Sequence, residues 1–267
     1  MGDRILSLLC VVCVAVTCAA GIWFAGAGVG PADSDVLYQV SSIGALMEGE
    51  YGGLVAFGEI KEHGDFGIGT FDRLDGELIA INGEYFQVTA DGAVRPVSDG
   101  MTAPFATVTF FEPDISFSFS RADNFSDFGR QVEAVLPSGD MVYAVRATGQ
   151  FPRVLARSVP RQEEPYPRLV DATKGQSVFV INGTRGTVAG FWFPESFAGL
   201  NVPGFHLHYI TSDASAGGHI LDLSVDGATV ELDMTPRFFM ATPSGKGGGS
   251  KVPPPNSTEL EEVEKIG

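Results

Sequence analysis

Cysteine is nearly absent from this 267-residue sequence, and its three cysteines all lie in one apolar run near the start. Beyond Cys10, Cys13 and Cys18 there is no thiol, so the rest of the chain can form neither a disulfide nor a cysteine nucleophile. Positive charge is also scarce: 17 lysines and arginines against 33 aspartates and glutamates give a formal net charge of −16. Because nucleic-acid binding needs a basic surface, we exclude DNA and RNA as partners.

Charge is missing altogether from residues 5–30, which begin with an apolar run and then become rich in glycine and alanine. Arg4 before this run and the small residues at 25–27 after it are typical of a signal peptide. Left uncut, the same segment is long enough to span a bilayer, so a membrane anchor is the alternative. We therefore expect residues 1–33 to be a signal peptide or N-terminal membrane anchor. The protein would be exported, extracytoplasmic or secreted, or tethered to a membrane through residues 5–30.

Histidine is rare as well, yet three of the four histidines lie in one short segment. His206 and His208 are two residues apart on an expected strand, 204–211, so their side chains point to the same face. The stretch 212–218 is rich in serine, alanine and glycine and indicates a turn, which places His219 opposite His208 on a return strand. Three neutral imidazoles converging from a hairpin leave a coordination position open, as in a catalytic zinc site. A structural zinc would usually recruit thiolates, which are missing here.

A His-x-His pair on a strand can also be no more than a polar, half-exposed face. The third histidine, at hairpin distance in a histidine-poor chain, favours a metal site. We expect Zn²⁺, although imidazole ligands suit other divalent ions. The fourth histidine, His63, has no histidine near it in the sequence and is expected in a loop or beside the site.

Short runs of β-branched and aromatic residues predict strands through most of the chain. The expected strands are 36–40, 54–60, 66–71, 78–81, 85–88, 106–111, 141–147, 177–181, 187–193, 204–211, 219–225 and 230–234. Asn-Gly pairs at 82–83 and 182–183 predict hairpin turns. Helices are expected only at 41–47, after a serine cap, and at 126–136, where apolar residues share one side.

The fold class is therefore α+β, with two β-rich subdomains of mixed or antiparallel sheet and few helices. The expected subdomains are 34–165, of α/β type, and 166–242, which carries the histidine hairpin. Residues 243–267 begin as a glycine- and proline-rich linker and end in an acidic segment, 259–264, which by itself predicts a solvated tail.

Several motifs together resemble the α-acetolactate decarboxylases, over residues 36–234. They are 37–39, the long glycine-rich block 57–71, 74–77, 104–106, 157–160 and the histidine hairpin. The resemblance implies a homodimeric two-domain lyase with zinc held by three histidines in the cleft between the domains. Its expected reaction converts 2-acetolactate, a 2-hydroxy-3-oxo acid, into acetoin and carbon dioxide.

The resemblance also assigns site residues. It makes His206, His208 and His219 the metal ligands. It places catalytic residues at Thr70, Glu77, Arg157 and a glutamate of the C-terminal tail. The tail residue is Glu264, with Glu261 and Glu262 as alternatives because the linker departs from the family pattern.

The expected decarboxylation requires residues of these types. Loss of carbon dioxide leaves an electron pair that must be stabilised as an enediolate, which zinc can do by binding substrate hydroxyl and carbonyl oxygens. Arg157 can hold a carboxylate through two hydrogen bonds, and Glu77 or the tail glutamate can protonate the enediolate if burial raises its pKa. Without the resemblance, Thr70 is an ordinary strand residue, Glu77 a turn residue, and Arg157 a surface partner of Glu163 or Glu164.

Two other functions also use three histidines. A carbonic-anhydrase-like zinc lyase has a His-x-His pair and a further histidine, but its third ligand lies farther along the chain. A role as an extracytoplasmic metal-binding or carrier protein would account for the net negative charge and the export segment. Carriers, however, usually fill every coordination position of the metal with protein ligands.

Overall fold

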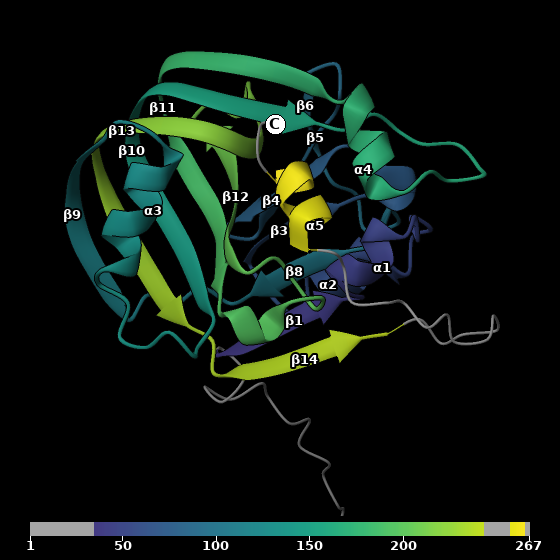
Figure 1. Ribbon diagram of the computed structural model, residues 1–267, viewed down its shortest axis with the longest axis horizontal. Coiled ribbons are helices and arrows are strands. Elements are labelled where there is room, and N and C mark those ends of the chain that lie inside the picture. Colours follow the sequence, from purple (N-terminus) through teal and green to yellow (C-terminus); the bar gives the residue numbers. More distant parts are fainter. Residues whose placement is uncertain (1–34, 243–256, 265–267) are drawn as a thin grey trace, which may run out of the picture. The chain divides into compact units, whose positions relative to one another are not determined.

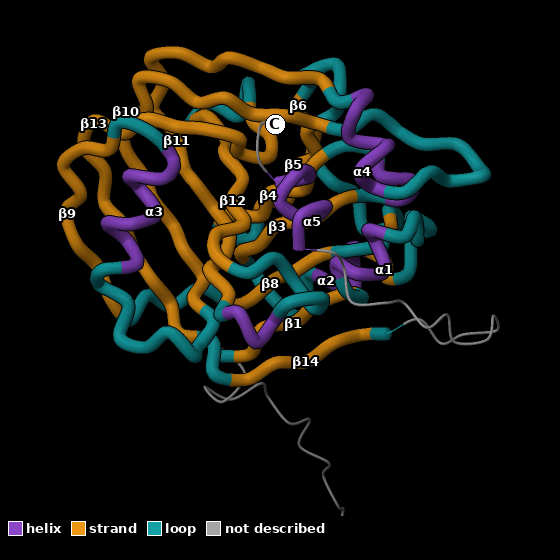
Figure 2. Tube along the Cα trace, in the orientation of Figure 1, coloured by secondary structure: helices purple, strands orange, loops and turns teal. Residues whose placement is uncertain are grey.

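Two β-sheets form the framework of the protein, drawn from a computed structural model as a ribbon in Figure 1 and as a Cα trace in Figure 2. The structure describes residues 35–242 and 257–264. The expected signal peptide or anchor and the linker at 243–256 lie outside these residues. None of the described helices is both long and apolar enough to cross a membrane.

The first sheet has seven strands in the order β14-β1-β8-β3-β4-β5-β6. Its neighbours are antiparallel except for β1 and β14, which run parallel. The strands are β1 (Val36–Val40), β3 (Phe66–Thr70), β4 (Glu77–Ile81), β5 (Glu84–Val88), β6 (Val94–Pro96), β8 (Ala106–Thr109) and β14 (Arg237–Ala241). A separate two-stranded sheet pairs β2 (Val55–Ala56) with β7 (Thr102–Ala103).

The second sheet is antiparallel, with five strands in the order β10-β11-β12-β13-β9. They are β9 (Ile115–Ala122), β10 (Tyr143–Ser158), β11 (Ser177–Phe193), β12 (Gly204–Thr211) and β13 (Gly217–Met234). Because β10 pairs with β13 as well as with β11, strands β10 to β13 close into a ring. One apolar core joins all five strands to helix α3 (Phe125–Glu133), whose Phe128 and Val132 are fully buried.

The two sheets are joined by a second apolar cluster. It includes Ile68 and Ile79 from the first sheet and Phe191 and Ile210 from the second. Side chains alternate along a strand, so the neighbours of these residues at i±2 face the same interface. This interface is where the candidate site forms.

The remaining helices are short. They are α1 (Ile43–Met47), α2 (Phe57–Ile60), α4 (Leu169–Ala172) and α5 (Ser257–Glu264), with 3-10 turns at Asp72–Leu74, Thr173–Gly175 and Glu195–Phe197. The expected serine cap of α1 is Ser42, whose hydroxyl accepts the backbone N–H of Ala45 at 3.2 Å. Side chains of α1, α4 and α5 share a third apolar cluster.

The predicted fold class is confirmed: the structure is β-rich, with mixed and antiparallel sheets and few helices. The division into subdomains at residue 165 stays a prediction. Strands β9 and β10, which precede that residue, pair with strands that follow it.

Three local predictions are wrong. Residues 57–60 form α2 rather than a strand, because Phe57 and Ile60 lie one helical turn apart and are both buried. There is no hairpin at Asn182-Gly183: β11 runs through it because β10 pairs with β11 on both sides of the expected turn. Residues 219–234 likewise belong to one strand, since β10 pairs with it from His219 to Met234 and β9 pairs with it from Val225 to Leu232, across the expected break.

Asp233, near the end of β13, carries a buried carboxyl group. Burial raises its pKa to about 7, and the charges of Asp114, Asp35 and Glu112 add to the rise, although the carboxylate accepts the Glu112 N–H at 3.3 Å. The folded state therefore keeps this proton up to about pH 7, whereas an unfolded aspartate loses it near pH 4. This group makes the protein less stable as the pH rises between these values.

Asp233→Asn removes the titration and keeps an acceptor for the Glu112 N–H. We expect it to stabilise the protein at pH 8 by on the order of 2 kcal/mol, roughly 5 °C in Tm, and by less at pH 5.5. Differential scanning calorimetry at both pH values measures the change, with the exposed Asp226→Asn on the same strand as the control. An equal gain at both pH values would contradict the assignment.

Candidate metal centre

Strand alternation turns three histidines toward the interface between the sheets. Ile210 of β12 packs into the cluster between the sheets, so His208 and His206, two and four residues earlier, face the same way. The Cα partner of His208 on β13 is His219. The hairpin and its register, predicted from the spacing of the histidines, are confirmed.

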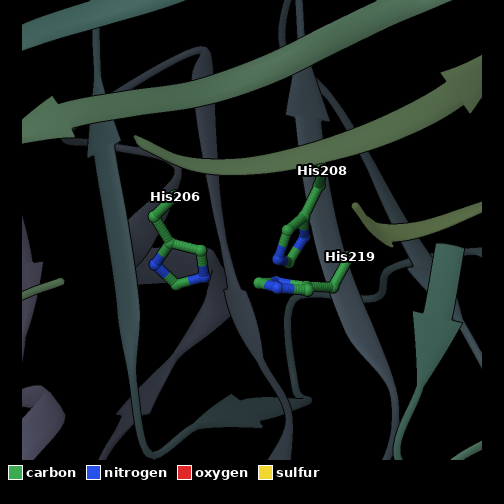
Figure 3. A group of neighbouring side chains, drawn as sticks. All are labelled: His206, His208 and His219. Atoms are coloured by element: carbon green, nitrogen blue, oxygen red, sulfur yellow. The ribbon is translucent and has the colours of Figure 1, made fainter. Parts of the chain in front are cut away.

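The three rings face one another (Figure 3). Their centroids are 5.2 to 5.5 Å apart, and one nitrogen from each ring lies within 4.8 Å of the others. Nitrogens bound to one tetrahedral ion at about 2 Å lie roughly 3.3 Å from each other. Modest ring rotations would therefore bring these nitrogens to bonding distance of a shared ion, and the donor set fits a metal.

Hydrogen bonding leaves ring nitrogens available for such an ion. His208 Nδ1 lies 2.8 Å from the Leu78 carbonyl oxygen, which can only accept, so this nitrogen carries the proton. The lone pair of His208 is therefore on Nε2. Neither that atom nor His206 Nδ1 has a hydrogen-bond partner among the described residues, although both are buried. Buried polar atoms are rarely left in this state unless something binds them.

The protonation state also suits metal ligands. Burial lowers the pKa of His206 to about 3, and the nearby positive charge of Arg157 adds to the effect. Burial likewise holds the pKa of His208 well below its usual value, with His206 and Arg157 adding to the shift and the Leu78 carbonyl opposing it. Both imidazoles are therefore neutral at neutral pH, the form that coordinates a cation.

The first sheet contributes Thr70 and Glu77, which are directly opposed Cα partners on β3 and β4. Each is two residues from an isoleucine of the cluster between the sheets, so both face the second sheet. Thr70 Oγ1 donates to the Gly76 carbonyl at 2.7 Å, which ties it to the turn before Glu77. Gly76 has φ of 90°, and a Cβ there would lie 2.3 Å from the Val88 carbonyl oxygen, so only glycine fits this turn. Glu77 Oε2 lies 3.7 Å from His208 Nε2.

Arg157 is the Cα partner of His219 and is only 5% exposed. Its Nη1 donates to Gln176 Oε1 at 3.1 Å and to the Val263 carbonyl, whereas its Nε has no hydrogen-bond partner among the described residues. The guanidinium therefore keeps donor capacity for a ligand. The alternative of a surface pairing with Glu163 or Glu164 is wrong, because Arg157 is buried in the sheet interface.

One cavity is lined by all six of these side chains: Thr70, Glu77, Arg157, His206, His208 and His219. The rest of its lining is mostly apolar and includes Ile43 and Leu46 of α1, Leu169 of α4 and Val263 of α5. The six residues that were predicted to form one site therefore do line the same cavity in the structure.

Comparison with known proteins identifies the same family as the sequence motifs. The family model described as alpha-acetolactate decarboxylase matches residues 37–247. The chain belongs to this family. The α-acetolactate decarboxylase of Methanosarcina mazei is 48% identical over 233 residues, covering 87% of this chain and 81% of that relative. The one from Bacillus subtilis strain 168 is 38% identical over 208 residues, covering 78% and 82%. The crystal structure of α-acetolactate decarboxylase from the same strain matches with a TM-score of 0.83 at 36% identity, covering 86% of this chain and 99% of that chain.

The acidic segment near the C-terminus of this family member is docked rather than solvated in the part that the structure describes, so that prediction is wrong. Residues 257–264 form α5, in which Leu260 and Val263 are buried and Val263 lines the cavity. Glu264 is the last residue of α5, and its side chain lies outside the described part of the chain, as does that of Glu261. Glu262 is exposed. The assignment of Glu264 as a catalytic residue stays a prediction.

Two features of the decarboxylase site have no signal in the sequence. Gln176, which holds Arg157, lies in an ordinary loop, and the Leu78 carbonyl that orients His208 is a backbone group. His63, expected in a loop or beside the site, stacks on Tyr38 at 4.0 Å between ring centroids and is not part of the cavity lining.

Proposed function

We propose that this protein removes carbon dioxide from 2-acetolactate and releases acetoin, using a divalent metal ion held by His206, His208 and His219. One observation carries the proposal. In a chain of the α-acetolactate decarboxylase family, three buried imidazoles, a buried arginine and a buried glutamate line the same cavity. The relatives of the chain are named for this reaction.

We propose Zn²⁺ as the metal, because three imidazoles with an open position are typical of catalytic zinc, although other divalent ions also accept such ligands. When bound, the ion supplies a Lewis acid that draws electron density from the substrate oxygens. The Leu78 carbonyl supports this role, since its hydrogen bond with Nδ1 fixes the orientation of the His208 ring.

Arg157 is proposed to bind and orient substrate oxygens. The substrate is an anion entering a chain of net charge −16, so it needs a local positive charge. The buried guanidinium of Arg157, which lines the cavity and has an unused Nε, provides that charge and directs it through hydrogen bonds.

Glu77 is proposed to deliver the proton that replaces carbon dioxide. Its side chain is only 10% exposed and lies beside His208, so it adjoins the position where the electron pair develops. The cavity lining is mostly apolar, which favours protonation of the carbon by a positioned acid over protonation by solvent. Thr70 supports Glu77 by bonding the Gly76 carbonyl in the preceding turn, and Glu264, next to Val263, is the second proposed acid.

Incubation of the full-length, zinc-loaded protein with racemic 2-acetolactate tests the proposal. We expect acetoin and carbon dioxide in equal amounts, well above the spontaneous loss measured without protein. Absence of acetoin would overturn the proposal. A parallel assay of carbon dioxide hydration tests the carbonic-anhydrase alternative. A metal that binds without any turnover would indicate the carrier alternative, and neither alternative is favoured by an observation in this structure.

A homodimer is also proposed. Strand β14 is one edge of the first sheet, and its Phe238 and Phe239 are 37% and 57% exposed. An exposed apolar edge strand can pair with the same strand of a second copy. Sedimentation equilibrium is expected to give the mass of two chains, and a monomeric mass would contradict the proposal.

We further propose that residues 1–33 export the protein, as a cleaved signal peptide or a retained anchor. The uncharged run at 5–30, the preceding Arg4 and the small residues at 25–27 support this proposal. Cell fractionation with mass spectrometry of the intact protein distinguishes the two forms. A full-length chain found only in the cytoplasm would contradict both.

A further inference from the structure

Arg168 joins the three helices whose side chains help to line the cavity. It is the N-cap residue of α4, and the next residue, Leu169, lines the cavity. One of its partners is Glu48, the C-cap of α1, which contributes Ile43 and Leu46 to the lining. The other is Glu259 of α5, the helix that contributes Val263. Figure 1 shows α4 with α1 and α5 close to it.

Arg168 makes a bidentate contact with Glu259. Arg168 Nη1 and Nη2 each lie 2.9 Å from a different Glu259 oxygen, and Nη2 also lies 2.6 Å from Glu48 Oε1. This fork geometry is specific to arginine and fixes orientation as well as distance. The hydrogen bonds with Arg168 lower the pKa of Glu259, so the pair stays ionised at neutral pH.

Helix α5 depends on such contacts for its position. With eight residues it is too short to be stable alone in water, so it forms because it docks. Docking buries Leu260 and Val263 against α1 and α4. The Arg168 contact holds the helix near its start, and the bond from Arg157 Nη1 to the Val263 carbonyl holds it near its end.

We propose that Arg168 is a positioning residue of the active site. Its bidentate contact with Glu259, together with its contact with Glu48, fixes the position of α5. The Val263 carbonyl then holds Arg157 in the orientation that binds the substrate. This inference rests on the proposed function, in which Arg157 binds substrate oxygens. Arg168 itself touches neither the cavity nor the three histidines among the described contacts.

The kinetic consequence is a change in KM rather than in kcat. If only the protein with α5 docked binds substrate well, the apparent affinity is the intrinsic affinity multiplied by the docked fraction, so undocking raises KM. Saturating substrate restores docking. We expect Arg168→Gln to raise KM about tenfold and to leave kcat within about twofold. Arg168→Glu, which places three carboxylates together, should raise KM further. The metal content of both variants should match that of the wild type.

A charge swap gives the sharpest test. Arg168→Glu combined with Glu259→Arg again places one arginine against two glutamates, at 168 and 48, so KM should return to within about threefold of the wild type. The matched control is Arg153→Gln. Arg153 is 45% exposed, against 41% for Arg168, and pairs with one carboxylate, Asp222, at 3.0 Å. The KM of the Arg153→Gln variant should not change.

Hydrogen exchange followed by mass spectrometry provides a readout apart from activity. Amides of α5 should exchange faster in Arg168→Gln and Arg168→Glu and at the wild-type rate in the charge swap. If the charge swap does not fold, judged by circular dichroism, Glu259→Gln must raise KM and speed exchange as Arg168→Gln does.

Unchanged KM and unchanged exchange in Arg168→Gln, with an active wild type, would overturn the inference alone. An inactive wild type would overturn the proposed function, while the exchange data would still decide whether Arg168 holds α5.

Discussion

Replacing His208 by alanine is expected to remove the bound metal and to lower the rate of acetoin formation by at least about a thousandfold, about 4 kcal/mol of transition-state stabilisation. His208 is central to the site. It is 1% exposed, its Nδ1 donates to the Leu78 carbonyl, and its Nε2 is left for a ligand. Two imidazoles bind a divalent ion far more weakly than three. Plasma mass spectrometry of the purified variant gives the metal content, and an assay with 2-acetolactate gives the rate.

His63→Ala is the matched control, because His63 is the one histidine of the sequence that is not in the site. It stacks on Tyr38, so its loss can reduce stability, but metal content and kcat should remain those of the wild type. A folded His208→Ala variant that kept full metal content and full activity would exclude the three-histidine site.

Replacing Arg157 by glutamine is expected to lower kcat/KM by about 10² to 10³-fold while leaving the metal content unchanged. Hydrogen bonds to charged groups contribute about 1.5 to 3 kcal/mol each, and the substrate would lose up to two of them. Arg157→Lys keeps the positive charge but not the fork, so its activity should lie between those of the wild type and the glutamine variant. Steady-state kinetics with 2-acetolactate measure all three proteins.

Arg146→Gln is the control for this series. Arg146 lies on the same strand, β10, is 18% exposed and pairs with Glu231 at 2.8 Å. It lies outside the cavity lining, so kcat/KM should change by less than about twofold. Equal kinetics for Arg157→Gln and Arg146→Gln would show that Arg157 does not bind the substrate.

The histidine hairpin could be predicted because its geometry is local. Two histidines at a spacing of two, a turn rich in small residues and a third histidine after the turn determine the register, and the structure pairs His208 with His219 as expected. Thr70, Glu77 and Arg157 came from the family resemblance. The structure adds the physical reason for their meeting, which is that β3, β4 and β10 present them to the interface between the two sheets.

The parts that could not be predicted depend on contacts between distant segments. Leu260 and Val263, three residues apart in an acidic stretch, were too weak a signal for a docked helix, and their partners lie in α1 and α4. Strand β11 continues through Asn182-Gly183 only because β10 pairs with it on both sides. The bond between Arg157 and Gln176 likewise joins two segments whose approach is set by the whole sheet.

Metal titration of the apoprotein tests the central claim most directly. The metal is removed with a chelator, Zn²⁺ is added back in steps below one equivalent per chain, and acetoin formation is measured at each step. The rate should start at the spontaneous level, rise in proportion to the added zinc and stop rising at one ion per chain. Full activity in the metal-free protein, or one bound zinc per chain with no acetoin formed, would contradict the proposed metal-dependent decarboxylation.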